Sequence, residues 1–82
     1  MYAVYIVRCA DDTYYTGIAK DVKKRLEEHN TSAKGAKYTM ARRPVTLVYE
    51  EPCEDRSSAS KREYAIKRLK RIQKVALIQK GV

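Results

Sequence analysis

The chain has 82 residues and a formal net charge of +8, from 18 Lys and Arg against 10 Asp and Glu. A chain of this length is expected to form one domain, residues 1–82, with a modest core and an open surface cleft instead of an internal cavity. Residues 1–41 carry seven basic and five acidic side chains, whereas residues 42–82 carry eleven and five. This excess favours a polyanionic partner, either nucleic acid or an anionic membrane surface.

Other classes are excluded by what the sequence lacks. No apolar run approaches the roughly 18 residues of a membrane helix, and the first residues lack the pattern of a secretory signal. We therefore expect a cytoplasmic protein without a membrane span. Cys9 and Cys53 are too few and too far apart for a zinc site, and His29 is the single histidine. Free thiols are expected in a reducing compartment, and any metal is expected to be held by oxygen.

The N-terminal segment predicts a β-hairpin. Residues 2–8 and 13–18 are rich in aromatic and β-branched side chains, and a turn cluster, Ala10-Asp11-Asp12, lies between them. The hairpin would bring Tyr5 and Tyr15 onto neighbouring strands.

A helix is predicted next, over residues 22–30. Asp21 precedes it and can accept hydrogen bonds from the free amides of the first turn. Arg25 and His29 border the apolar stripe of this helix and are expected to face the edge of the sheet.

The middle of the chain is predicted as a loop and a strand. Residues 31–43 show no periodicity and resemble a basic loop that ends at Pro44. A third strand is predicted over residues 45–49, followed by a turn over residues 50–55 that contains Pro52.

The last third is predicted to be helical. Ser57 or Ser58 can cap a helix, and a final stretch, offset by a bend near Ile72, runs to Gln79 before Gly81. The order β-β-α-β-α-α predicts an α+β domain with a three-stranded antiparallel sheet flanked by helices. One face of the helix is expected to hold Ala59, Ala65, Ile66, Leu69 and Ile72.

Five side chains that can transfer a proton or bind a phosphate or a metal follow one another along the chain. Tyr5 and Tyr15 lie ten residues apart, Arg25 and His29 lie one helical turn apart, and Glu63 is the only acid among residues 56–82. Phosphodiester hydrolysis requires an activated water, neutralised phosphoryl oxygens and a stabilised leaving oxygen. A tyrosine, an arginine and a metal would suffice for these tasks.

These residues resemble the GIY-YIG nuclease domain over almost the whole chain. Ala3-Val4-Tyr5 and Tyr15-Thr16-Gly17 stand where that family has its two name-giving triplets, with Thr16 in place of Ile. Residues 35–39 and 42–44 are similar to the compact, single-domain (stand-alone) branch. The resemblance implies a metal-dependent endonuclease acting on DNA, with RNA as a second candidate, and one Mg²⁺ or Mn²⁺ ion bound with the substrate.

The resemblance also implies a role for each side chain. Tyr5 would position or deprotonate the water, and Tyr15 would hydrogen-bond the phosphate. Arg25 would offer a planar fork to two phosphate oxygens. His29 would orient Tyr5 or donate to the phosphate, and Glu63 would bind the metal.

Each of these residues has a structural alternative. The tyrosines could be half-buried strand aromatics, Arg25 a solvated helix cation, and His29 a favourable partner for the helix dipole. Glu63 could form an ordinary surface pair with Lys67. A free phenol is only about 0.1% ionised at pH 7, so Tyr5 can act as a base only if positive charge lowers its pKa or a metal shares the task.

A basic surface is predicted to bind nucleic acid. Gly17 would let the backbone approach the substrate, or would merely mark the end of a strand. Tyr38 would stack on an unpaired base, or would pack a solvated loop. The other residues predicted to bind nucleic acid are Lys34, Lys37, Arg42, Arg43, Lys67 and Lys70.

Two other functions stay open. Many family members carry an Asn after the metal-binding Glu, whereas the only Asn here is Asn30, so Gln73 or Lys74 would have to substitute. This departure favours a catalytically weak nucleic-acid-binding module. A subunit whose specificity comes from a protein partner is the third possibility, because the chain has no zinc finger or helix-turn-helix module.

The charge distribution predicts nucleic-acid binding that is steep in salt and weakly selective for sequence. Neutralising about four to seven duplex phosphates implies a log–log salt slope of about −4 to −6. The slope can be measured by fluorescence anisotropy with duplexes of unrelated sequence. A slope near zero, or a strong preference for one unstructured sequence, would contradict the electrostatic interpretation.

Overall fold

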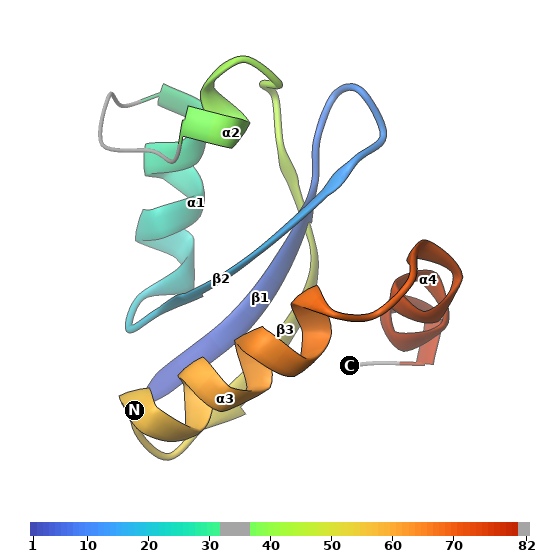
Figure 1. Ribbon diagram of the computed structural model, residues 1–82. Helices are drawn as coiled ribbons and strands as arrows, with labels where there is room; N and C mark the ends of the chain where they lie inside the picture. The colour runs from blue at the N-terminus through green and yellow to red at the C-terminus, as the bar shows by residue number, and fades with distance from the viewer. Residues whose placement is uncertain (32–36, 81–82) are drawn as a thin grey trace.

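The computed structural model describes residues 1–31 and 37–80, which form a central sheet with helices on both faces (Figure 1). Lys34 and Gly81 lie outside the described residues. The strand order is β2-β1-β3, and both pairings are antiparallel. The elements are β1 (Tyr2–Arg8), β2 (Tyr14–Ala19), α1 (Val22–Thr31), α2 (Lys37–Met40), β3 (Thr46–Cys53), α3 (Arg56–Lys67) and α4 (Arg71–Lys80). This confirms the predicted fold class and element order, with α2 as an additional short helix.

Strand β1 is buried on both faces because it is the central strand. Its residues 3–7 are all at most 8% exposed. Tyr5 and Val7 pack against α1 on one face, whereas Val4 and Ile6 pack against α3 on the other. The side chains of a strand alternate between faces, so Tyr5, Tyr15 and Gly17 share the face that α1 covers.

The elements that surround the site are fastened by side chains. The Asp21 carboxylate accepts a hydrogen bond from the Lys24 amide at 3.1 Å and caps α1 as predicted. At the other end of α1, the Asn30 amide exchanges two hydrogen bonds with the main chain of Val45, at 2.7 and 3.1 Å. The end of α1 is thereby fixed to the start of β3, a contact that the sequence analysis did not foresee.

Three predicted boundaries in the middle of the chain are wrong. Strand β3 continues through Pro52 to Cys53 where a turn was predicted, because β3 is an edge strand and proline is tolerated there. The predicted loop contains α2, and helix α3 is capped by Asp55, not by Ser57 or Ser58. The Asp55 carboxylate accepts a hydrogen bond from the Ser58 amide at 2.8 Å.

The predicted apolar face of the C-terminal helices is also partly wrong. Ala59 and Ile66 are fully buried, but Ala65 is exposed and Ile72 is 77% exposed. The chain leaves the α3 axis at residues 68–70 and starts α4 in a new direction (Figure 1), so one helical wheel does not extend across both.

Candidate active site

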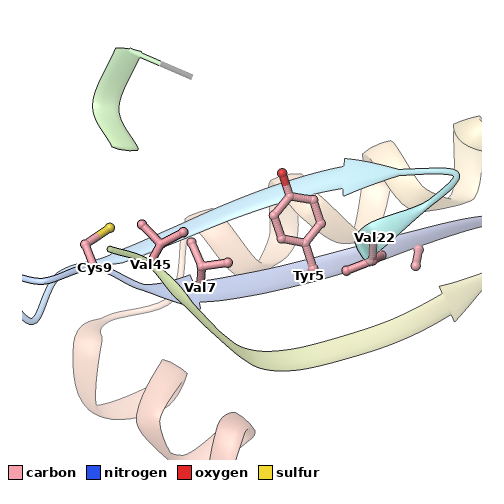
Figure 2. Packing of buried hydrophobic residues seen from close by; sticks show 6 residues of the cluster. Tyr5, Val7, Cys9, Val22 and Val45 are labelled. Atoms are coloured by element: carbon pink, nitrogen blue, oxygen red, sulfur yellow. The ribbon is translucent and has the colours of Figure 1, made fainter. Parts of the chain in front are cut away.

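Tyr5 lies across the edge strand β2 at Gly17. The two residues face each other in the β1–β2 pairing, and a side chain at Gly17 would place its Cβ 2.6 Å from the Tyr5 hydroxyl oxygen. Figure 2 shows the Tyr5 ring rising from β1 over β2, on the side of the sheet that carries Val7 and Val22. The absence of a side chain at Gly17 is therefore explained by the Tyr5 ring, and close approach to a substrate is not needed to account for it.

The Tyr5 hydroxyl meets His29 in the core. Tyr5 Oη lies 2.7 Å from His29 Nε2, and the other ring nitrogen, Nδ1, lies 2.8 Å from the Thr39 hydroxyl. Tyr5 is 2% exposed, and His29 and Thr39 are completely buried. The ring of Tyr15 packs edge-on against His29, with 5.2 Å between the ring centroids. His29 thus links both tyrosines to α1, so its contacts go beyond those of a side chain that only interacts with the helix dipole.

Burial raises the pKa of Tyr5 to about 12, and the nearby Tyr15 hydroxyl acts in the same direction. A hydrogen bond from the Arg25 guanidinium and its positive charge act in the opposite direction but are smaller. Positive charge was expected to lower this pKa if Tyr5 is a base, and in the free protein burial outweighs it. Burial also lowers the pKa of His29, with smaller contributions in the same direction from Arg25 and Arg43, so the imidazole is neutral at pH 7.

Arg25 stands between the site and the surface. Its guanidinium lowers the pKa of the Tyr5 phenol and donates a hydrogen bond to the Glu28 carboxylate at 2.9 Å. The side chain is 29% exposed, so it is not a fully solvated helix cation. A guanidinium has five N–H donors, which lets it keep these partners and still turn N–H groups toward a phosphate.

Glu63 comes from the opposite face of the sheet. Helix α3 packs against β1 and β2 on the face that Val4 and Ile6 occupy, yet the Glu63 charge contributes to the raised pKa of Tyr5. Its carboxylate also forms the predicted surface pair with the Lys67 ammonium, at 3.3 Å. Tyr5 and His29 therefore lie on one face of the sheet, and Glu63 comes from the helix on the other face.

The basic residues of the predicted nucleic-acid surface fall into two groups. The Arg42 guanidinium donates to the Asp11 carboxylate at 3.0 Å and lies 3.9 Å from the centroid of the Tyr38 ring. The Arg43 guanidinium donates to the main-chain oxygen of His29, at 2.5 Å, at the end of α1. These two arginines hold the chain in place, whereas the exposed basic residues are Lys37, Lys67 and Lys70.

Tyr38 belongs to an aromatic column that leads to the site. Its ring stacks on Tyr15 with 6.0 Å between centroids and an interplanar angle of 25°, and the residue is 38% exposed. The ring is thus engaged by Tyr15 and Arg42, so a base would have to stack on the part that remains exposed.

Sequence reasoning missed Thr39 as a residue of the site. It lies ten residues after His29, in a stretch without periodicity, and nothing in its local sequence indicates that its hydroxyl reaches the imidazole. Helix α2 was not predicted either, and α2 is what carries Thr39 into the core.

Tyr15, Arg25 and His29 thus gather around the buried phenol of Tyr5, and α3 carries Glu63 on the other face of the sheet. Residues 1–75 match the sequence profile of the GIY-YIG catalytic domain, and the chain belongs to that family, which places it in a nuclease superfamily. Members of that family typically depend on a divalent metal.

The relatives are small proteins. The chain is 62% identical over 76 residues to UPF0213 protein DP2720 of Desulfotalea psychrophila, covering 93% of this chain and 69% of that protein. It is 56% identical over 78 residues to UPF0213 protein SERP0126 of Staphylococcus epidermidis, covering 95% and 94%. The solution structure of UPF0213 protein BH0048 from Bacillus halodurans has the same fold, with 40% identity and a TM-score of 0.61 over 96% of this chain and 84% of that one.

No helix among residues 1–31 and 37–80 is long and apolar enough to cross a membrane.

The buried His29 predicts a loss of stability in mild acid. Its pKa is lowered in the folded protein from an unfolded value of about 6.5, so the unfolded chain binds the proton first. The free energy of unfolding should fall as the pH drops below about 6.5, by at most about 1.4 kcal/mol per pH unit, until His29 titrates in the folded state.

Urea unfolding between about pH 5 and 7 measures this slope, and His29→Gln is the control because it removes the titrating group and keeps a polar side chain. The pKa values of Asp11 and Asp55 are also lowered, but carboxylates contribute to the slope mainly at lower pH. The same slope in the parent protein and in His29→Gln would contradict a depressed pKa at His29.

Proposed function

We propose that this protein is a metal-dependent endonuclease that hydrolyses phosphodiester bonds of DNA, with RNA as a second candidate substrate. The proposal rests on one arrangement: the Tyr5 phenol is hydrogen-bonded to His29, and Arg25 and Glu63 both lie close enough to influence its pKa. Membership of the GIY-YIG family supports the same chemistry.

The proton step requires both Tyr5 and His29. With a pKa of about 12 for Tyr5, only about one molecule in 10⁵ carries a phenolate at pH 7. The small fraction of phenolate does not limit the reaction if the phenol takes a proton from the attacking water while its own hydrogen moves to His29 Nε2, 2.7 Å away. The water oxygen then forms the new bond to phosphorus, the bond to the leaving oxygen breaks, and that oxygen takes a proton from solvent.

Arg25 and Tyr15 supply the contacts to the phosphate. Charge develops on the phosphoryl oxygens as the water attacks, and a guanidinium whose charge already acts on the Tyr5 hydroxyl stands where it can neutralise this charge. The Tyr15 ring is fixed edge-on against His29, so its position relative to Tyr5 is set by packing. We propose that the Tyr15 hydroxyl donates a hydrogen bond to a phosphate oxygen.

The residues present fit a weakly held Mg²⁺ or Mn²⁺ ion. No group of three or more possible ligands occurs among the described residues, and Glu63 is the one carboxylate on α3. A single carboxylate suits an ion that keeps most of its waters and takes substrate phosphate as a further ligand. Such an ion would stabilise negative charge on the phosphate and the leaving oxygen, and Lys67 would give up its bond to Glu63 when the ion binds.

Two observations favour the second candidate, a nucleic-acid-binding module with weak catalysis. The pKa of Tyr5 is raised, which opposes its use as a base, and the Glu63 carboxylate is occupied by Lys67 in the free protein. The two candidates differ in whether the bound nucleic acid is cut. A panel of single-stranded, duplex, nicked and branched substrates with Mg²⁺ and Mn²⁺ separates them, and binding without cleavage on every substrate would contradict the nuclease.

Tyr5→Phe tests the proton step, because phenylalanine keeps the packing and removes only the hydroxyl. The single-turnover cleavage rate should fall by about 10²–10⁴, the usual contribution of a positioned general base. The matched control is Tyr49→Phe, which removes a partly buried hydroxyl bonded to Glu51 at 2.6 Å on the other face of the sheet. This control should lose some stability and keep the parental rate, whereas an unchanged rate in Tyr5→Phe would refute the base.

Glu63→Gln tests the metal site, because catalysis and binding should separate there. Glutamine keeps the volume and helix propensity but is a poor ligand, so metal-dependent cleavage should drop to background. Affinity for nucleic acid without divalent metal should stay equal or rise, since a negative charge leaves a basic surface. Glu51→Gln is the control, because it weakens the ion pair between Glu51 and Arg62, and Arg62 lies on α3 next to Glu63.

Two results would contradict the metal assignment. One is cleavage by Glu63→Gln at the parental rate, which would make Glu63 only the partner of Lys67. The other is an equal loss in Glu51→Gln, which would trace the effect to the packing of α3 and not to a metal.

A further inference from the structure

The imidazole of His29 is held from both sides in the core. Nε2 lies 2.7 Å from the Tyr5 hydroxyl, and Nδ1 lies 2.8 Å from the Thr39 hydroxyl. A neutral imidazole has one nitrogen that donates and one that accepts. The ring therefore donates one of these two hydrogen bonds and accepts the other, so the direction of either bond determines the direction of the second.

Arg25 decides which nitrogen carries the hydrogen. The Arg25 guanidinium can only donate, and its hydrogen-bonding groups and positive charge lower the pKa of Tyr5, so the lone pairs of the phenol oxygen face Arg25 and its hydrogen faces away. Among the described residues, His29 Nε2 is the remaining partner of this hydroxyl and can accept the phenolic hydrogen. The opposite arrangement would aim two donors at the phenol oxygen and leave its own hydrogen buried without an acceptor, which folded proteins avoid.

We infer that Thr39 is a positioning residue for the proposed hydrolysis: its hydroxyl accepts the Nδ1 hydrogen of His29 and so presents Nε2 as the proton acceptor for Tyr5. The reaction part of this inference rests on the proposed function, whereas the orientation of the ring does not. When Nε2 receives the proton, both N–H groups of the imidazolium keep an oxygen partner. An imidazole held in the wrong tautomer cannot take the proton.

The segment that carries Thr39 is fastened on both sides. The Arg42 amide donates to the Thr39 carbonyl at 3.0 Å, and the Arg42 side chain is tied to Asp11 in the hairpin turn. The next residue, Arg43, bonds the carbonyl of His29 itself. Two predicted nucleic-acid contacts thus hold Thr39 against the ring. This explains how one hydroxyl on a four-residue helix can fix a buried imidazole.

The tautomer can be measured directly, since His29 is the only histidine. Imidazole ¹⁵N NMR at a pH where the ring is neutral should show a hydrogen on Nδ1 and none on Nε2 in the parent protein. Thr39→Val removes the hydroxyl at similar shape and should lose this preference, whereas Thr39→Ser should keep it. A hydrogen on Nε2 in the parent protein, or an unchanged tautomer in Thr39→Val, would overturn the inference.

Cleavage gives the second measurement. Thr39→Val should slow single-turnover cleavage by about 10- to 100-fold, the range seen when a supporting group behind an active residue is lost. Metal-free binding to DNA should stay the same, and Thr39→Ser should recover most of the rate. An active parent protein with an equally active Thr39→Val would overturn the positioning role.

The two measurements keep the inference separate from the proposed function. A parent protein that cleaves no substrate contradicts the nuclease, while its tautomer still decides whether Thr39 orients His29. If Thr39→Val does not fold, the parental tautomer and Thr39→Ser carry the test. Loss of the Nδ1 hydrogen in Thr39→Ser would then count against the inference.

Discussion

The buried hydrogen bond between Tyr5 and His29 is the contact on which the site depends. It joins the central strand to α1, and it forms only because Gly17 leaves room for the phenol to lie across β2. A methyl group at Gly17 would stand 2.6 Å from the hydroxyl oxygen, so even alanine would push the phenol away from the imidazole. The glycine of the second triplet and the tyrosine of the first are thus one packing unit.

Two arginines of the predicted nucleic-acid surface form structural hydrogen bonds in the free protein. Arg42 and Arg43 were assigned to nucleic acid from charge alone, and their guanidinium groups bond Asp11 and main-chain carbonyls around α2. An arginine bonded to a carbonyl still contributes its full charge to the surrounding field, so Arg43 can attract a polyanion without touching it. The exposed lysines at positions 37, 67 and 70 carry no such structural bond to a carbonyl among the described contacts. Their ammonium groups are the more exposed part of the predicted nucleic-acid surface, with Lys67 also paired to Glu63.

The sequence was sufficient for features that depend on local pattern. The alternating hairpin, the Asp21 cap and the placement of Arg25 beside the sheet follow from spacing and propensity, and the structure has them. Features that depend on tertiary contacts were missed. Pro52 suggested a turn because sequence alone does not show that β3 is an edge strand, and the effect of burial on the pKa of Tyr5 requires the packed core. Resemblance to a family gave the order of the site residues, but not the contact between Thr39 and His29.

The site is divided between the two layers of the domain, and this has an electrostatic consequence. Tyr5 and His29 belong to the α1 face, Glu63 to the α3 face, and the edge strand β2 separates them. In the free protein burial and the Tyr15 hydroxyl raise the pKa of Tyr5 most, Arg25 lowers it, and the Glu63 charge makes the smallest contribution. A cation beside Glu63 would remove only the smallest of the effects that oppose ionisation of Tyr5, while burial and Tyr15 would remain. The acidity of the phenol is thus set mainly by its burial on the α1 face, so the proton transfer proposed for it depends on His29 at 2.7 Å and not on a charge across the sheet.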